Sequence, residues 1–113
     1  MTPESMRAEG ELVLARICSE AALFGVTLTG LVWSAGRFDR QRDPASGEDA
    51  LIVVWKLDGR RVQLTLRPDG NIFAECDLLI DHPQKPKFWM DTLTVWGTAS
   101  ALKAEPNLIE KPV

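Results

Sequence analysis

The sequence predicts an α+β fold in which an N-terminal helix packs on a four- or five-stranded antiparallel meander sheet, followed by a short C-terminal helix or tail. The first observation behind this class is an amphipathic segment at the start of the chain. The second is a series of segments rich in Val, Ile, Leu and Thr, separated by residues typical of tight turns. At 113 residues the chain has the length of one domain, so we expect a single α+β domain over residues 1–113.

The first element is predicted to be a helix over residues 3–24. Thr2 is a typical N-cap residue, Pro3 suits the first helical position, and Gly25 is the residue type that commonly ends a helix. Apolar residues recur at helical spacing and form one stripe, which comprises Val13, Leu14, Ile17, Cys18, Ala21 and Phe24. That stripe needs an apolar partner surface, which we expect to be a sheet.

Strands are predicted at residues 26–33, 50–57, 61–66 and 71–80, with a possible fifth strand at residues 88–96. The turn residues Asp58-Gly59 and Pro68-Asp69-Gly70 predict two short hairpin loops. Together they set a register in which every opposed pair on one face is apolar: Trp55–Val62, Val53–Leu64, Leu51–Leu66, Leu66–Ile72, Leu64–Ala74 and Val62–Cys76. We expect the helix to cover this face.

Two segments are expected to lie outside the regular core. Residues 34–49 contain almost no apolar side chains and several turn residues, which predicts a mobile loop. Residues 98–104 are predicted to form a short helix, and residues 105–113 a loose tail because Pro106 and Pro112 interrupt it. The order of one helix and an antiparallel meander resembles, in fold alone, the layout of cystatin-like small folds.

Composition and charge argue against several classes of function. The chain is 45% hydrophobic and 26% charged, as soluble globular domains are, and its net charge of -3 argues against nucleic acid as a partner. It has no cationic leader and no long apolar run, so we expect a cytoplasmic protein that binds no membrane. Cys18 and Cys76 lack Cys-x-x-Cys spacing and His82 is the only histidine, so we expect reduced core thiols, no metal and no cofactor.

The second face of the predicted sheet carries more apolar surface than open water favours. Its candidate contact residues are Leu31, Trp33, Ile52, Val54 and Phe73, joined by Trp89 and Trp96 from the C-terminal segment. One helix covers only one face, so the C-terminal segment, a second copy or a ligand must cover the other. Because symmetric dimers are the commonest assemblies, the leading hypothesis is a non-enzymatic interaction module. Its partner is either itself, as a homodimer that pairs sheet faces or edges, or another protein.

A polar grouping supports an alternative function. Glu75, Asp77, Asp81 and His82 lie close in sequence and offer carboxylates and an imidazole for a divalent cation or for acid–base chemistry. They predict a small-molecule- or metal-binding protein or enzyme, with a pocket between the sheet and the C-terminal segment. The predicted register gives Asp77 a cross-strand partner in Arg61, which favours an ordinary polar surface instead. No complete catalytic motif accompanies the group, so an enzyme is not the first expectation.

A third grouping, Arg37, Arg40 and Arg42, falls within the predicted loop. Guanidinium groups suit contact with phosphate or carboxylate anions. Asp39 and Asp43 are interleaved with the arginines, which favours a solvated loop whose charges compensate one another.

Overall fold

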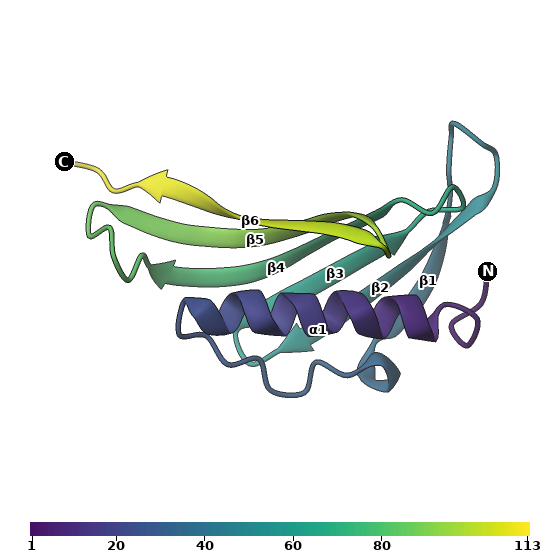
Figure 1. Cartoon of the computed structure of the whole chain (residues 1–113), viewed down its shortest axis with the longest axis horizontal. Helices are drawn as coiled ribbons and strands as arrows, with labels where there is room; N and C mark the ends of the chain where they lie inside the picture. Colours follow the sequence, from purple (N-terminus) through teal and green to yellow (C-terminus); the bar gives the residue numbers. More distant parts are fainter.

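In the computed structural model, which describes all of residues 1–113, one helix is followed by a six-stranded antiparallel sheet (Figure 1). Helix α1 spans Arg7–Leu23 and a short 3-10 helix, η1, spans Trp33–Ala35. The strands are β1 (Arg37–Arg42), β2 (Asp49–Leu57), β3 (Arg60–Leu66), β4 (Ile72–Asp81), β5 (Phe88–Thr98) and β6 (Ala101–Glu110). They lie side by side in chain order, which confirms the α+β class and the antiparallel meander.

The two central hairpins have the predicted register. Trp55 faces Val62 between β2 and β3, and Leu64 faces Ala74 between β3 and β4. The glycines of the two turns, Gly59 and Gly70, have φ angles of 72° and 88°, which residues with a side chain rarely adopt. Because side chains alternate along a strand, this register collects the apolar residues of β2, β3 and β4 on one buried inner face.

Helix α1 and residues 24–36 cover the inner face. The helix contacts β4, β5 and β6 and runs along one side of the sheet (Figure 1), where its residues Val13, Ile17 and Ala21 are fully buried. Beside β2, the indole Nε1 of Trp55 donates a hydrogen bond of 2.8 Å to the carbonyl oxygen of Val32. The covering segment therefore completes the core that the helix begins. No helix of the chain combines the length and apolar character needed to cross a membrane.

Trp33 joins the helix to the sheet. Its indole Nε1 donates a hydrogen bond of 3.1 Å to the carbonyl oxygen of Pro3, just before α1. Its ring centroid lies 5.1 Å from that of Phe38 and 6.2 Å from that of Trp55. A Cβ atom at Gly10 would overlap ring atoms of Trp33, so the glycine provides the space that the indole occupies. The side chains of α1, η1, β1 and β2 thus form one packed unit.

The predicted strand at residues 26–33 is wrong, because this segment is an irregular covering loop that ends in η1. Gly25 and Gly30 have φ angles of 80° and 86°, which interrupt an extended conformation. Its apolar residues Leu31 and Trp33 are 7% and 5% exposed and belong to the inner core. The helix itself starts at Arg7 instead of residue 3, since residues 3–6 form a turn in which the Thr2 hydroxyl accepts a hydrogen bond from the amide of Ser5.

The predicted loop at residues 34–49 contains a strand, β1, and the predicted C-terminal helix at residues 98–104 is absent. Residues Ala101–Glu110, which include most of the predicted loose tail, form β6 instead. Helix-forming residues such as Ala101 and Leu102 are extended here because β6 pairs with β5 along its whole length. The possible fifth strand is present as β5, so the sheet has six strands in place of four or five.

The close contact between Gly10 and Trp33 predicts an unusual sign for a helix substitution. Replacing Gly by Ala inside a helix normally stabilises a protein by about 1 kcal/mol. We expect Gly10→Ala to destabilise the chain by about 1–3 kcal/mol, because the hydrogen-bonded indole must shift to admit a methyl group. Urea unfolding measures the change, with the exposed Ser19→Ala on the same helix as the control. A stabilised Gly10→Ala variant would contradict the packing described here.

Candidate functional site

The outer face of the sheet is the side that points away from α1, and it carries partly exposed apolar side chains. Phe73 is 45% exposed and Trp89 is 42% exposed, whereas Ile52, Val54 and Trp96 are half-buried. All five lie on this face, which is where the sequence places Ile52, Val54 and Phe73. Leu31 and Trp33, which were predicted beside them, are corrected to the inner core because their segment is not a strand of the sheet.

Strand pairing arranges most of the outer face in three rows across the strands. The first row, in strand order, is Asp39, Ile52, Thr65, Phe73, Trp96 and Lys103. The second row is Arg37, Val54, Gln63, Glu75, Thr94 and Glu105. The third row is Lys56, Arg61, Asp77, Thr92 and Asn107. The first two rows have a charged side chain at each end. The third row has a charged side chain at one end, and its charges continue from Lys56 through Asp77.

The charges at the ends of the first two rows have no ion-pair partner within the chain. Arg37, Asp39, Lys103 and Glu105 are all exposed, and none belongs to any of the ion pairs. On the half of the face formed by β1–β3, the rows contain more cationic than acidic side chains: Arg37, Lys56 and Arg61 against Asp39. On the half formed by β4–β6, they contain more acidic than cationic side chains: Glu75, Asp77 and Glu105 against Lys103. The two halves thus have opposite charge.

Both edges of the sheet are poorly suited to pairing with a further strand. On the β6 edge, Pro106 has no backbone N–H, and Arg16 Nη1 donates a hydrogen bond of 3.1 Å to the carbonyl oxygen of Leu102. The β1 edge carries several exposed charged residues, which also disfavour strand addition. The outer face is therefore the better surface for association.

The predicted polar grouping is dispersed over several local contacts. Asp77 Oδ2 accepts a hydrogen bond of 3.0 Å from the Arg61 amide, in agreement with the predicted neighbour, and Glu75 is exposed on the outer face. Asp81 forms an ion pair of 2.8 Å with Lys111. His82 Nδ1 accepts hydrogen bonds of 3.0 and 3.1 Å from the amides of residues 84 and 85, which stabilises the turn after β4. No group of three or more potential ligands is placed to hold a metal ion.

The three arginines of β1 do not converge on one anion site. Arg37 faces Val54 and belongs to the outer face, whereas Arg40 faces the buried Leu51 and points to the opposite side. Arg40 and Arg42 line a shallow hollow that also contains Glu48 and Asp49. Acidic neighbours therefore share this hollow with both arginines.

An apolar hollow lies at the end of the outer face where β4, β5 and β6 meet. It is an open depression of about 600 Å³, and Leu79, Trp89 and Ile109 line it together with Asp81. A bulge in β4 places Leu79 at a φ of 54°, a strained conformation for leucine, with its side chain 58% exposed. Of these residues, sequence reasoning missed Ile109, because β6 has no clear local signal.

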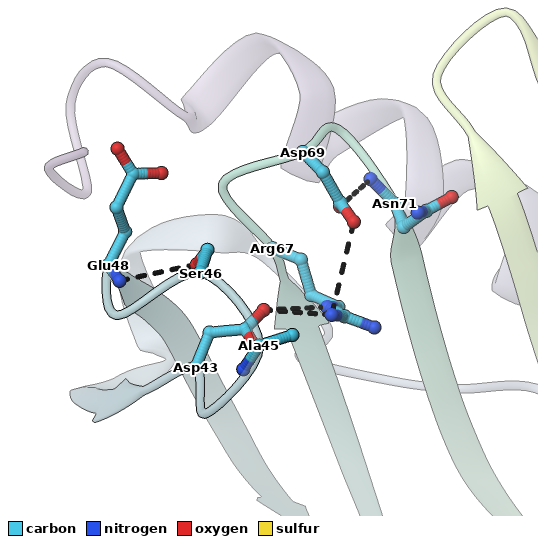
Figure 2. A network of polar contacts seen from close by, with 7 residues as sticks. All are labelled: Asp43, Ala45, Ser46, Glu48, Arg67, Asp69 and Asn71. Carbon is cyan, nitrogen blue, oxygen red and sulfur yellow. Dashed lines mark hydrogen bonds and ion pairs between the residues drawn. The ribbon is translucent and has the colours of Figure 1, made fainter.

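A second feature that the sequence did not reveal is the ion pair between Asp43 and Arg67 (Figure 2). Arg67 Nε and Nη2 donate hydrogen bonds of 3.0 and 2.8 Å to Asp43 Oδ2, and the amide of Ala45 donates to Oδ1. The Ala45 amide and the Arg67 guanidinium lower the pKa of Asp43 below its ordinary value. Figure 2 shows that these contacts join the β1–β2 loop to the turn that follows β3. The network is structural, since its polar groups satisfy one another.

Neither cysteine forms a disulfide bond; Cys76 is buried and Cys18 is partly buried. Cys76 is fully buried on β4, and burial followed by the nearby charge of Asp77 raises its pKa to about 11. Burial also raises the pKa of Cys18 on α1. Nucleophilic chemistry requires the thiolate, so neither residue is suited to catalysis at neutral pH.

Comparisons of the chain with protein-family models, with curated proteins and with solved structures give no significant match. The outer face and its surroundings are therefore the features of the chain from which a function can be inferred.

The lowered pKa of Asp43 predicts a specific pH dependence of stability. A carboxyl group whose pKa is lower in the folded state than in the unfolded state stabilises the folded state when the pH is above the unfolded-state pKa. This stabilisation is lost as the pH falls through the folded-state pKa. We therefore expect Asp43→Asn to lower the free energy of unfolding at pH 7 and to reduce the loss of stability below the ordinary value of 3.8. Urea unfolding at neutral and acid pH measures both effects. The exposed Asp49→Asn is the control, and an equal effect there would contradict the role of Asp43.

Proposed function

We propose that this chain is a small, non-enzymatic interaction module that forms a homodimer through the outer face of its sheet. The observation that carries the proposal is the combination of partly exposed apolar side chains and unpaired charges on one face. Phe73 and Trp96 are neighbours on this face, and aromatic side chains are frequent anchors of protein interfaces. A second copy would shield them from water.

The dimensions of the sheet support an interface of modest size. Six strands about 4.8 Å apart, each about 25 Å long, give a face on the order of 600 Å². Two such faces bury on the order of 1,200 Å², which is the lower end of the range for specific interfaces. We therefore expect a dimer that dissociates on dilution.

This proposal predicts the effect of a charge placed among the apolar side chains of the first row. We expect Phe73→Glu to weaken the dimer by about 30-fold or more, because a buried anchor is worth about 2 kcal/mol and a carboxylate resists desolvation. Sedimentation velocity over a range of concentrations measures the dissociation constant. The control is Leu12→Glu, which makes the same charge change at an exposed leucine on α1 and is expected to leave the dimer intact. An unchanged dimer of the Phe73 variant would refute this interface.

A second candidate function, binding of a small molecule, is favoured by the hollow beside Leu79. Its volume of about 600 Å³ lies within the range of ligand pockets. The backbone at Leu79 is strained and holds the leucine side chain at the rim of the hollow. Strain of this kind is frequent at binding sites. In this alternative, Trp89 and Ile109 would contact the apolar part of a ligand and Asp81 its polar end.

Native mass spectrometry of freshly purified protein tests the second candidate. We expect a ligand mass on the wild-type chain and its loss in Leu79→Asn, because asparagine tolerates a positive φ but removes the apolar contact. Thermal unfolding verifies that this variant stays folded. A wild-type spectrum without any adduct would contradict ligand binding.

A further inference from the structure

We propose that the two copies of the dimer are related by a two-fold axis that lies in the interface, parallel to the strands, above the line between β3 and β4. This inference rests on the proposed function, since it specifies how the outer faces meet. A rotation about this axis places β1 over β6, β2 over β5 and β3 over β4 of the second copy. It therefore brings the cationic half of each outer face against the acidic half of the other.

The first two rows show the charge complementarity that this axis requires. In the second row, Arg37 on β1 comes to lie over Glu105 of the second copy. In the first row the signs are reversed, and Asp39 comes to lie over Lys103. Both residues of each pair are exposed and have no ion-pair partner within their own chain. Opposite charges therefore meet at both ends of both rows, although the sign alternates from one row to the next.

The centre of the interface agrees with the same axis. In the third row, Arg61 on β3 comes to lie over Asp77 on β4 of the second copy. In the first row, Ile52 on β2 comes to lie over Trp96 on β5, which pairs an aliphatic with an aromatic side chain. Apolar contacts thus lie between the charged ends, as in interfaces with an apolar core and a polar rim.

The other in-plane axis, perpendicular to the strands, would place each strand over the same strand of the second copy. The cationic half of one face then meets the cationic half of the other, and an axis above the second row places Arg37 over Arg37 and Glu105 over Glu105. Like charges that face each other across an interface oppose association. An axis between the first two rows would place Arg37 over Asp39 instead, and the exchange of charges described below distinguishes that arrangement from the proposed one.

The strands of two stacked sheets cross at roughly 30°. In the proposed dimer this angle displaces the ends of a row by about 6 Å over half the width of the sheet. Long side chains such as Arg37 and Lys103 can extend over that displacement.

The test exchanges the charges of one proposed pair. In low-salt buffer we expect Arg37→Glu and Glu105→Arg each to weaken the homodimer about tenfold or more, because each places like charges at both ends of the second row. The matched control is Arg40→Glu, which makes the same change on the same strand but on the opposite side of the sheet. Sedimentation velocity measures the dissociation constants, and circular dichroism verifies that each exposed variant is folded.

Mixing the two variants gives the decisive result. In a heterodimer of Arg37→Glu with Glu105→Arg, both ends of the row regain opposite charges, so we expect affinity within about threefold of the wild type. Native mass spectrometry distinguishes the heterodimer from either homodimer by mass. Asp39→Lys mixed with Lys103→Asp repeats the test in the first row and is expected to give the same recovery.

The outcomes separate this inference from the proposed function. A wild-type dimer whose variants show no preference for the heterodimer would overturn the axis but leave the homodimer standing. A gain in affinity for Arg37→Glu mixed with the wild type would indicate a perpendicular axis above the second row instead, since the introduced glutamate would then face Arg37 of the second copy. A wild-type chain that stays monomeric at all concentrations would overturn both.

Discussion

The single helix of this chain can cover only one face of its six-stranded sheet, and the rest of the structure depends on that constraint. Successive side chains along a strand point to opposite faces of the sheet. When one residue of a strand points into the core, the residues before and after it therefore point to the outer face. The helix contacts β4, β5 and β6, and the loop that carries Trp33 extends the cover beside β2. Nothing in the chain is left to cover the outer face, although that face retains Phe73 and Trp96.

The inner core and the outer face have different physical roles. On the inner side, buried residues such as Val53 and Leu64 have no exposed surface, and Gly10 leaves space for one indole ring. Such packing stabilises the monomer and tolerates little change in volume. On the outer side, partly exposed apolar residues alternate with charges that have no partner in the chain. These charges contribute little to the fold, but they can determine which surface binds and in which orientation.

The fold was predictable where local chemistry agrees with tertiary packing. The Asp58-Gly59 turn and the alternation that follows it predict the register of β2 and β3, and the structure confirms it. Prediction from local sequence fails for β1, because its exposed residues show no alternation of apolar and polar side chains. It fails for β6 as well, because Ala101 and Leu102 favour a helix in isolation. It also fails where β-branched residues pack as a covering loop, which removes Trp33 from the predicted interface. The ends of the first two outer-face rows lie on β1 and β6, so their pairing could not be found from sequence.

Self-association through the outer face is the central claim, and the four tryptophans provide internal reporters for it. The indole N–H groups of Trp33 and Trp55 are hydrogen-bonded inside the core to the carbonyl oxygens of Pro3 and Val32, whereas Trp96 lies on the outer face. The most direct measurement is a dilution series that follows the indole resonances by ¹H–¹⁵N NMR. The account predicts that the Trp96 resonance shifts with concentration while those of Trp33 and Trp55 do not. Indole resonances that are all independent of concentration would contradict it.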